Sequence, residues 1–174
     1  MKKVLLSIVT IIIALILIVG ILELTSSYKV SEDINRNAPV QTQQQIIIHA
    51  TPEKIYHIMS DVNHWSAWNK DIQDPVMTLP FQKGNSFDWK SGGLTIHSTL
   101  HTAIPYRKIG WSGPAFGSFA IHNWTLIPNG NDTKVIVDES MEGWLVSLLA
   151  NKFQSHLELS LQGWLRDLKA QAEK

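Results

Sequence analysis

The sequence predicts an α+β fold in which an antiparallel sheet wraps against one long C-terminal helix, preceded by one transmembrane helix. Three observations support this prediction. A proline-free stretch at Gly143–Lys169 repeats apolar residues at three- and four-residue steps, which is the helical period. The segment from Phe87 to Glu139 contains runs that alternate apolar and polar residues, as strands do. An uncharged apolar run at Val4–Leu22 precedes both.

The composition excludes several classes of protein. The chain has 174 residues, and its 15 Lys and Arg side chains balance its 15 Asp and Glu side chains. No basic surface is indicated, so we expect no nucleic-acid partner. The chain contains no cysteine, which rules out a disulfide framework, cysteine-ligated zinc and a thiol nucleophile. Seven tryptophans are many for this length, and tryptophan fills cores or lines apolar pockets.

Residues 1–23 are predicted to form an N-terminal transmembrane signal anchor. Val4–Leu22 carries no charge, and as a helix it would span about 28 Å, close to the hydrocarbon thickness of a bilayer. Lys2 and Lys3 precede it, which favours a single pass through the cytoplasmic membrane with the N-terminus inside and the domain outside. A cleaved signal peptide is the alternative, although its apolar region is usually only about 7–15 residues long.

Residues 24–40 are predicted to form a polar tether. Most of their side chains are polar or charged, among them Thr25, Glu32 and Asp33. If it is flexible, a segment of this length has a root-mean-square reach of roughly 20–25 Å. The folded domain would therefore stay close to the membrane surface.

The folded domain is predicted to cover residues 41–172 and to begin with a strand at Gln41–His49, followed by two short helices. Thr51 has the chemistry of a helix N-cap, and Pro52 follows at the first helical position. Asp61 can cap the second helix in the same way. Both helices are too short to be stable alone, so they must dock on the rest of the domain.

The first predicted hairpin turns at Gly92-Gly93. A two-residue loop there places Trp89 opposite Ile96, so that apolar side chains meet on one face of the sheet. The following strand is expected at Arg107–Gly113. The register is self-consistent because apolar residues pair with apolar residues.

The second predicted hairpin turns at Asn129–Asp132. A two-residue loop and a four-residue loop give the same pairing, with Trp124 opposite Val137 and His122 opposite Glu139. The apolar members of this face indicate that it points inward. We therefore expect His122 and Glu139 to be neighbours on the concave side of the sheet, beneath the long helix.

His122 and Glu139 are the best candidates for polar chemistry. A carboxylate beside an imidazole in a partly apolar cavity can hold a polar group of a ligand, or can act as an acid/base pair. A buried structural ion pair is the simpler interpretation, and we prefer it to a catalytic role.

The predicted ligand-binding residues are mostly large apolar side chains that face the expected cavity. Each of them can equally be ordinary core. They are Trp68, Trp89, Ile96, Trp111, His122, Trp124, Glu139, Phe153 and Leu157.

A metal site and a cofactor site are not expected. His97 and His101 lie four residues apart, but on a strand this spacing is about 13 Å, and both fall on the polar face. The sequence also contains no phosphate loop, nucleophile elbow or dinucleotide-binding motif.

Residues 41–170 resemble the START-like, Bet v 1-like superfamily, in particular the bacterial SRPBCC family of polyketide cyclases/dehydrases and lipid-transport proteins. The residues that carry the resemblance occur at family-like spacings along the chain. They are His49–Ile55, Ser60–Val62, Trp65–Asn69, Gly84 with Phe87, Ile109–Gly113, His122–Trp124 and Glu139–Gly143.

The resemblance implies a helix-grip fold, in which a curved antiparallel sheet and a long C-terminal helix enclose a cavity. Members bind lipids, sterols, aromatic polyketides or plant hormones, and a minority are enzymes, so the fold alone does not assign a function. The leading hypothesis is a membrane-anchored module that binds a hydrophobic or lipid-like small molecule. The alternatives are a cyclase or dehydratase that uses His122 and Glu139, and a protein-interaction module with a filled core.

Overall fold

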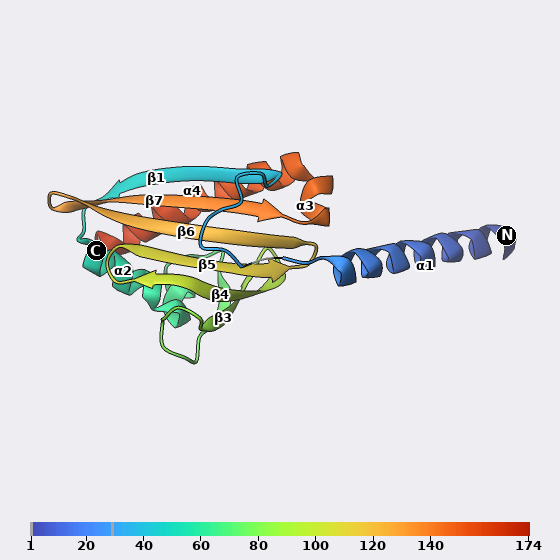
Figure 1. Ribbon diagram of the computed structural model, residues 1–174, viewed down its shortest axis with the longest axis horizontal. Helices are drawn as coiled ribbons and strands as arrows, with labels where there is room; N and C mark the ends of the chain where they lie inside the picture. Colours follow the sequence, from blue (N-terminus) through green and yellow to red (C-terminus); the bar gives the residue numbers. More distant parts are fainter. Residues whose placement is uncertain (1, 29) are drawn as a thin grey trace.

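A long N-terminal helix and a single α+β domain make up the chain. The computed structural model describes residues 2–28 and 30–174, and Figure 1 shows helix α1 (Lys2–Thr25) projecting away from the domain. None of the residues of α1 is buried. The helix is long and apolar enough to cross a membrane, a criterion that a signal sequence also meets.

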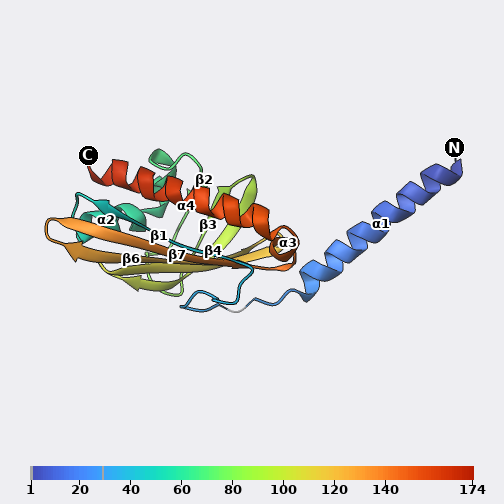
Figure 2. The same cartoon turned by 90° about the horizontal axis from the view of Figure 1, so that it is seen from above.

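One antiparallel sheet forms the body of the domain and confirms the predicted fold class. Its strands, within the described part of the chain, follow the order β1-β7-β6-β5-β4-β3-β2. They are β1 (Val40–Ile48), β2 (Gln73–Val76), β3 (Ser86–Ser91), β4 (Leu94–Ile104), β5 (Lys108–Ala115), β6 (Ser118–Asn129) and β7 (Asp132–Glu142). Helix α4 (Ala150–Ala172) lies along the concave face, as Figure 2 shows from above.

The two predicted hairpin registers are confirmed. Trp89 pairs with Ile96 across the β3–β4 hairpin. In the β6–β7 hairpin, Trp124 pairs with Val137 and His122 pairs with Glu139. The glycine turn and the Asn-Gly turn therefore set the positions of the concave-face side chains, as expected from turn chemistry.

The two short helices follow β1, but only the first is an α-helix. In α2 (Pro52–Ser60), the side chain of Thr51 accepts a hydrogen bond from the Lys54 amide, which confirms the predicted N-cap. The second element, η1 (Val62–Ala67), is a 3-10 helix. Asp61 forms no side-chain capping bond there. Its carboxylate instead contacts Nδ1 of His64 at 2.8 Å.

The C-terminal helix is not continuous, which corrects the prediction of one helix over Gly143–Lys169. A short helix α3 (Trp144–Leu148) comes first, and α4 begins at Ala150. Between them Leu149 leaves the helical region, with φ −122° and ψ 33°. The break lets α3 remain hydrogen bonded to the β5–β6 turn, where the Leu145 amide donates to the carbonyl of Gly117 at 3.1 Å.

The segment predicted as a polar tether lies against the convex face of the sheet, opposite α4 (Figure 2). The Asn35 amide donates to Oγ of Ser140 at 2.9 Å, and Nδ2 of Asn123 donates to the carbonyl of Glu32 at 2.9 Å. Glu32 also pairs with Lys83. Side chains in the sheet thus contact the described residues of this segment, so the reach expected of a flexible chain does not apply to them.

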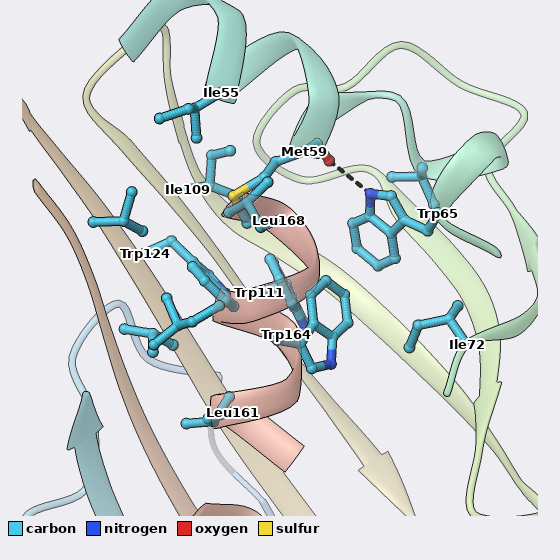
Figure 3. Packing of buried hydrophobic residues seen from close by; sticks show 14 of the residues in the cluster. Ile55, Met59, Trp65, Ile72, Ile109, Trp111, Trp124, Leu161, Trp164 and Leu168 are labelled. Carbon is cyan, nitrogen blue, oxygen red and sulfur yellow. Dashed lines mark hydrogen bonds between the residues drawn. The ribbon is translucent and has the colours of Figure 1, made fainter. Parts of the chain in front are cut away.

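Aromatic side chains fill the half of the layer between α4 and the sheet that lies next to α2 and η1, here called the inner half (Figure 3). The ring of Trp65 lies 5.2 Å from that of Trp164, 5.3 Å from that of Phe87 and 5.5 Å from that of Trp111, centroid to centroid. Nε1 of Trp65 donates to the carbonyl of Met59 at 2.9 Å, so this buried indole is hydrogen bonded.

Helix α4 also covers the outer edge of the sheet at β1. The amide side chain of Gln154 accepts from the Gln41 amide at 3.3 Å and donates to the Gln41 carbonyl at 3.1 Å. Further along, Nζ of Lys169 donates to the carbonyl of Ile47 at 2.7 Å.

Candidate functional site

A cavity of about 190 Å³ lies between α4 and the half of the sheet that carries the β3–β4 and β5–β6 turns, here called the outer half. Its walls are mostly apolar, and they come from strands β3 to β7 and from α4. The lining residues are Trp89, Ser91, Gly92, Leu94, Ile96, Ser98, Gly113, Ala115, Ser118, Ala120, His122, Glu139, Met141, Phe153, His156, Leu157, Ser160, Leu161 and Trp164.

Small residues on β5 and β6 create the space. Gly113, Ala115, Ser118 and Ala120 all line the cavity. Gly113 is glycine for a separate reason, because a Cβ there would lie 2.1 Å from the carbonyl oxygen of His97 on the neighbouring strand. The close approach of β4 and β5 therefore requires glycine, and the absent side chain enlarges the cavity.

The polar part of the cavity wall is the His122–Glu139 pair. Nδ1 of His122 lies 2.8 Å from Oε2 of Glu139, and the Glu139 side chain is only 3% exposed. The ring of Trp111 stacks on the imidazole at 5.1 Å and 21°, which restrains its orientation. Despite the short distance to His122, Oε2 has no hydrogen-bond partner of acceptable geometry among the described residues.

A buried carboxylate oxygen without a full hydrogen bond is energetically costly unless something else pairs with it. Because Glu139 lines the cavity, a hydroxyl or amine of a bound molecule can supply the missing donor. The arrangement is suited to orient one polar group of an otherwise apolar ligand. It also places an imidazole beside a carboxylate, as acid/base chemistry requires.

The structure brings together six of the nine predicted ligand-binding residues. Those that line the cavity are Trp89, Ile96, His122, Glu139, Phe153 and Leu157. Trp111 and Trp124 do not line it, because they are fully buried in the aromatic core. Trp68 does not line it either, since its ring packs edge-on against Trp164 at 5.7 Å.

The sequence analysis missed several lining residues. Trp164 and Leu161 belong to the apolar stripe of α4, and only the rotation of this helix shows that they face the cavity. Met141 lies near the end of β7, opposite Val40, and its side chain is on the inward-facing side of the strand. The small residues of β5 and β6 continue the two-residue alternation of Trp111 and Trp124, so the pattern places them on the concave face but does not indicate a cavity there.

The two histidines of β4 have different surroundings. His97 is exposed and pairs with Asp88 at 2.7 Å. His101 lies in a β-bulge, since Leu100 pairs with Trp111 whereas Thr102 pairs with Gly110. No group of three or more potential ligands occurs within residues 2–28 and 30–174.

His101 lies on the convex face, as predicted, but it is buried rather than exposed to solvent. It packs where a Cβ on Gly110 would lie, beside Asn123. Burial lowers the pKa of His101 from 6.5 to about 4, because the charged imidazole loses its hydration there. The neutral ring is therefore the form present at physiological pH.

Comparison with solved structures agrees with this architecture. A hypothetical protein of Helicobacter pylori superposes with a TM-score of 0.71 at 16% identity, over 84% of this chain and 99% of that chain. A START superfamily protein of Mycobacterium smegmatis gives 0.57 at 18% identity, over 74% and 98%. The di-domain ARO/CYC StfQ of the steffimycin biosynthetic pathway gives 0.65 at 15% identity, over 77% and 51%. At these identities the likeness establishes a shared fold.

The family model described as polyketide cyclase / dehydrase and lipid transport matches residues 39–173. The chain belongs to this family. The match begins at the first strand and ends with α4, so the polyketide cyclase/dehydrase and lipid-transport family accounts for the whole helix-grip domain. Helix α1 lies outside the family match. No curated protein is similar enough in sequence to count as a relative.

Proposed function

We propose that this protein is a membrane-anchored binding module that holds a hydrophobic or lipid-like small molecule between α4 and the sheet. The observation that carries the proposal is the cavity itself. Its walls are mostly apolar, and its buried carboxylate, Glu139, has an oxygen whose 2.8 Å contact with His122 lacks hydrogen-bond geometry. Membership of a family named for polyketide cyclases and lipid transport supports the same class of ligand.

The cavity dimensions narrow the ligand. A volume of about 190 Å³ is below the roughly 300–1,000 Å³ of typical drug-sized sites. The cavity suits one compact amphiphile, or one end of a longer lipid whose remainder extends through the opening. The enclosed end carries a hydroxyl or amine that donates to Glu139, and the rest is apolar.

Membrane anchoring is the second part of the proposal. Helix α1 has no buried residue and carries an uncharged apolar segment at Val4–Leu22, so it needs a hydrocarbon environment or removal by processing, because the surface of this segment is unfavourable in water. Lys2 and Lys3 favour an orientation with the N-terminus in the cytoplasm. The domain is then extracytoplasmic and remains next to the membrane surface.

Native mass spectrometry of the full-length protein, purified gently from membranes without added ligand, tests ligand binding. A discrete extra mass that is lost on denaturation and identified as an amphiphile supports the proposal. Glu139→Gln should lower the occupancy because an amide attracts a hydroxyl or ammonium donor less strongly than a carboxylate does. Asp138→Asn is the matched control, since Asp138 lies on the convex face and binds Gln43. The proposal is contradicted if no bound molecule is found in any of the three proteins, the unchanged chain and its two variants.

An enzyme with His122 and Glu139 as acid/base pair is a second candidate, favoured by the 2.8 Å contact between them. It predicts that His122→Ala abolishes turnover of a polyketide-like substrate and leaves the fold intact. An unchanged rate would exclude this role. The third hypothesis, an interaction module with a filled core, requires no cavity and is disfavoured by the observed one.

A further inference from the structure

Exposed leucines and one phenylalanine lie on the β5–β6 turn, on α3 and along the first half of α4. Leu148 is 71% exposed, Leu159 is 68% exposed and Phe116 is 48% exposed. Leu149, at the break between α3 and α4, is also exposed. We call these four residues, Phe116, Leu148, Leu149 and Leu159, the apolar rim. A water-facing cluster of large apolar side chains marks a surface that binds a partner.

The end of α1 is held directly against the apolar rim. Oε2 of Glu23 accepts hydrogen bonds from the Gly117 amide at 3.1 Å and from Nε1 of Trp144 at 2.9 Å. The ring of Trp144 in turn packs edge-on against Phe116 at 5.5 Å. Figures 1 and 2 both show α1 leaving from the end of the domain that carries α3.

A surface groove lies beside the cavity along the first turns of α4. Its lining residues are Leu149, Lys152, Phe153, His156 and Leu159. Leu149 and Leu159 belong to the apolar rim, while Phe153 and His156 also line the cavity. Only the side chains of Phe153 and His156 are therefore shared by the groove and the cavity, and a movement of these two side chains would connect them.

We propose that the apolar rim lies in the interface of the lipid bilayer, so that the groove opens into the membrane and an amphiphile passes between bilayer and cavity without crossing water. This proposal rests on the proposed membrane anchoring. The contacts of Glu23 fix the end of the spanning helix beside Phe116, which places the rim at the depth of the membrane surface. Lys152 in the groove is exposed and suits the phosphate of a lipid headgroup.

Burial of the rim accounts for residues that the fold itself leaves exposed. An apolar side chain that moves from water into the interface gains about 25 cal/mol for each Å² removed from water. Trp144 lies next to the rim with its indole nitrogen bonded to Glu23, and tryptophan is enriched at membrane interfaces. A bilayer interface can bury the leucines of this surface and can also place a lipid phosphate beside Lys152.

Site-directed fluorescence of the full-length protein tests the proposal, and the absence of cysteine makes each introduced thiol unique. Leu148→Cys and Leu159→Cys carry an environment-sensitive fluorophore in vesicles of phosphatidylcholine and phosphatidylglycerol. Nitroxide-labelled lipids then act as quenchers. We expect quenching at both positions to be several-fold stronger than at Asn131→Cys, the matched control in the exposed β6–β7 turn at the far end of the domain.

A label at Leu15→Cys, in the middle of α1, separates the two proposals. If this label is quenched and those at residues 148 and 159 resemble that at 131, the rim proposal is overturned while anchoring stands. If the label at residue 15 is not quenched, anchoring fails and the rim proposal fails with it. If the rim labels are already shielded in detergent and unaffected by lipid quenchers, a second copy of the chain covers the rim, which also overturns the proposal.

Discussion

The two halves of the layer between α4 and the sheet differ in packing although the same elements build both. Strand β5 supplies Trp111 to the inner half and Gly113 to the outer half, and β6 supplies Trp124 and Ala120 in the same way. Helix α4 spans both halves, and Trp164 closes the cavity between them. The cavity therefore arises from side-chain size along continuous strands, while the inner half provides the stability that an incompletely filled domain needs.

The largest expected effect comes from removing a ring in the inner half. Trp111→Ala should lower the free energy of unfolding by about 3–5 kcal/mol, because the cavity left by a fully buried aromatic cannot collapse. Chemical denaturation measures the change. Trp144→Ala, at a half-buried position beside the β5–β6 turn, is the control and should cost clearly less. Similar losses at both positions would contradict the difference between the halves.

Acid should destabilise the domain through His101, on the convex side of the inner half. Its pKa is about 4 in the folded protein, below the ordinary 6.5, so the unfolded chain binds a proton first as the pH falls. Stability is fully present above about pH 6.5 and declines towards pH 4, by about 3 kcal/mol at most. Denaturation at several pH values measures it.

The variant His101→Gln isolates this contribution from that of the carboxylates. It should show a flatter dependence of stability on pH between about 6.5 and 4, because the titrating ring is absent. Glu32 and Lys108 act on His101 in opposite directions, and both remain in the variant. Parallel curves for the two proteins would show that His101 is not buried in solution.

Enlarging a small residue should affect the two halves differently. Ala120→Leu places methyl groups in the cavity, so we expect a change in stability within about 1 kcal/mol together with a loss of bound ligand. Ala172→Leu, in the solid core, should instead cost about 1–3 kcal/mol through overpacking. Thermal denaturation and native mass spectrometry measure the two effects. A greater loss of stability at residue 120 than at residue 172 would refute the comparison.

The smallest expected effect is a gain in stability at Gly163, near the junction of the halves. A Cβ there would find nothing closer than 3.8 Å, so no close approach requires glycine. Gly163→Ala should stabilise the protein by up to about 1 kcal/mol through helix propensity. Gly113→Ala is the opposite control, because its Cβ would meet the backbone of His97. A loss of stability in Gly163→Ala would show that the helix requires flexibility there.

The sequence was sufficient to predict the sheet apart from its edge strand β2, the two hairpin registers and the His122–Glu139 pair, because turns and alternation are local signals. It did not predict the break at Leu149, since this depends on contacts between α3 and the distant Gly117. The burial of His101 was also missed, because Gly110, Asn123 and the segment around Glu32 create it together. Among the predicted cavity residues, Trp111 and Trp124 lie on the concave face of the sheet as expected. They pack in the inner half, however, and not beside the cavity.

The cover over β1 limits association between copies of the chain. An exposed edge strand offers free amide and carbonyl groups to which another chain can add a strand, a common start of aggregation. Gln154 occupies both hydrogen-bonding groups of Gln41 with one side-chain amide, as a neighbouring strand would, and Lys169 occupies the carbonyl of Ile47. The helix that closes the cavity thereby also protects the sheet from edge-to-edge association between copies of the chain.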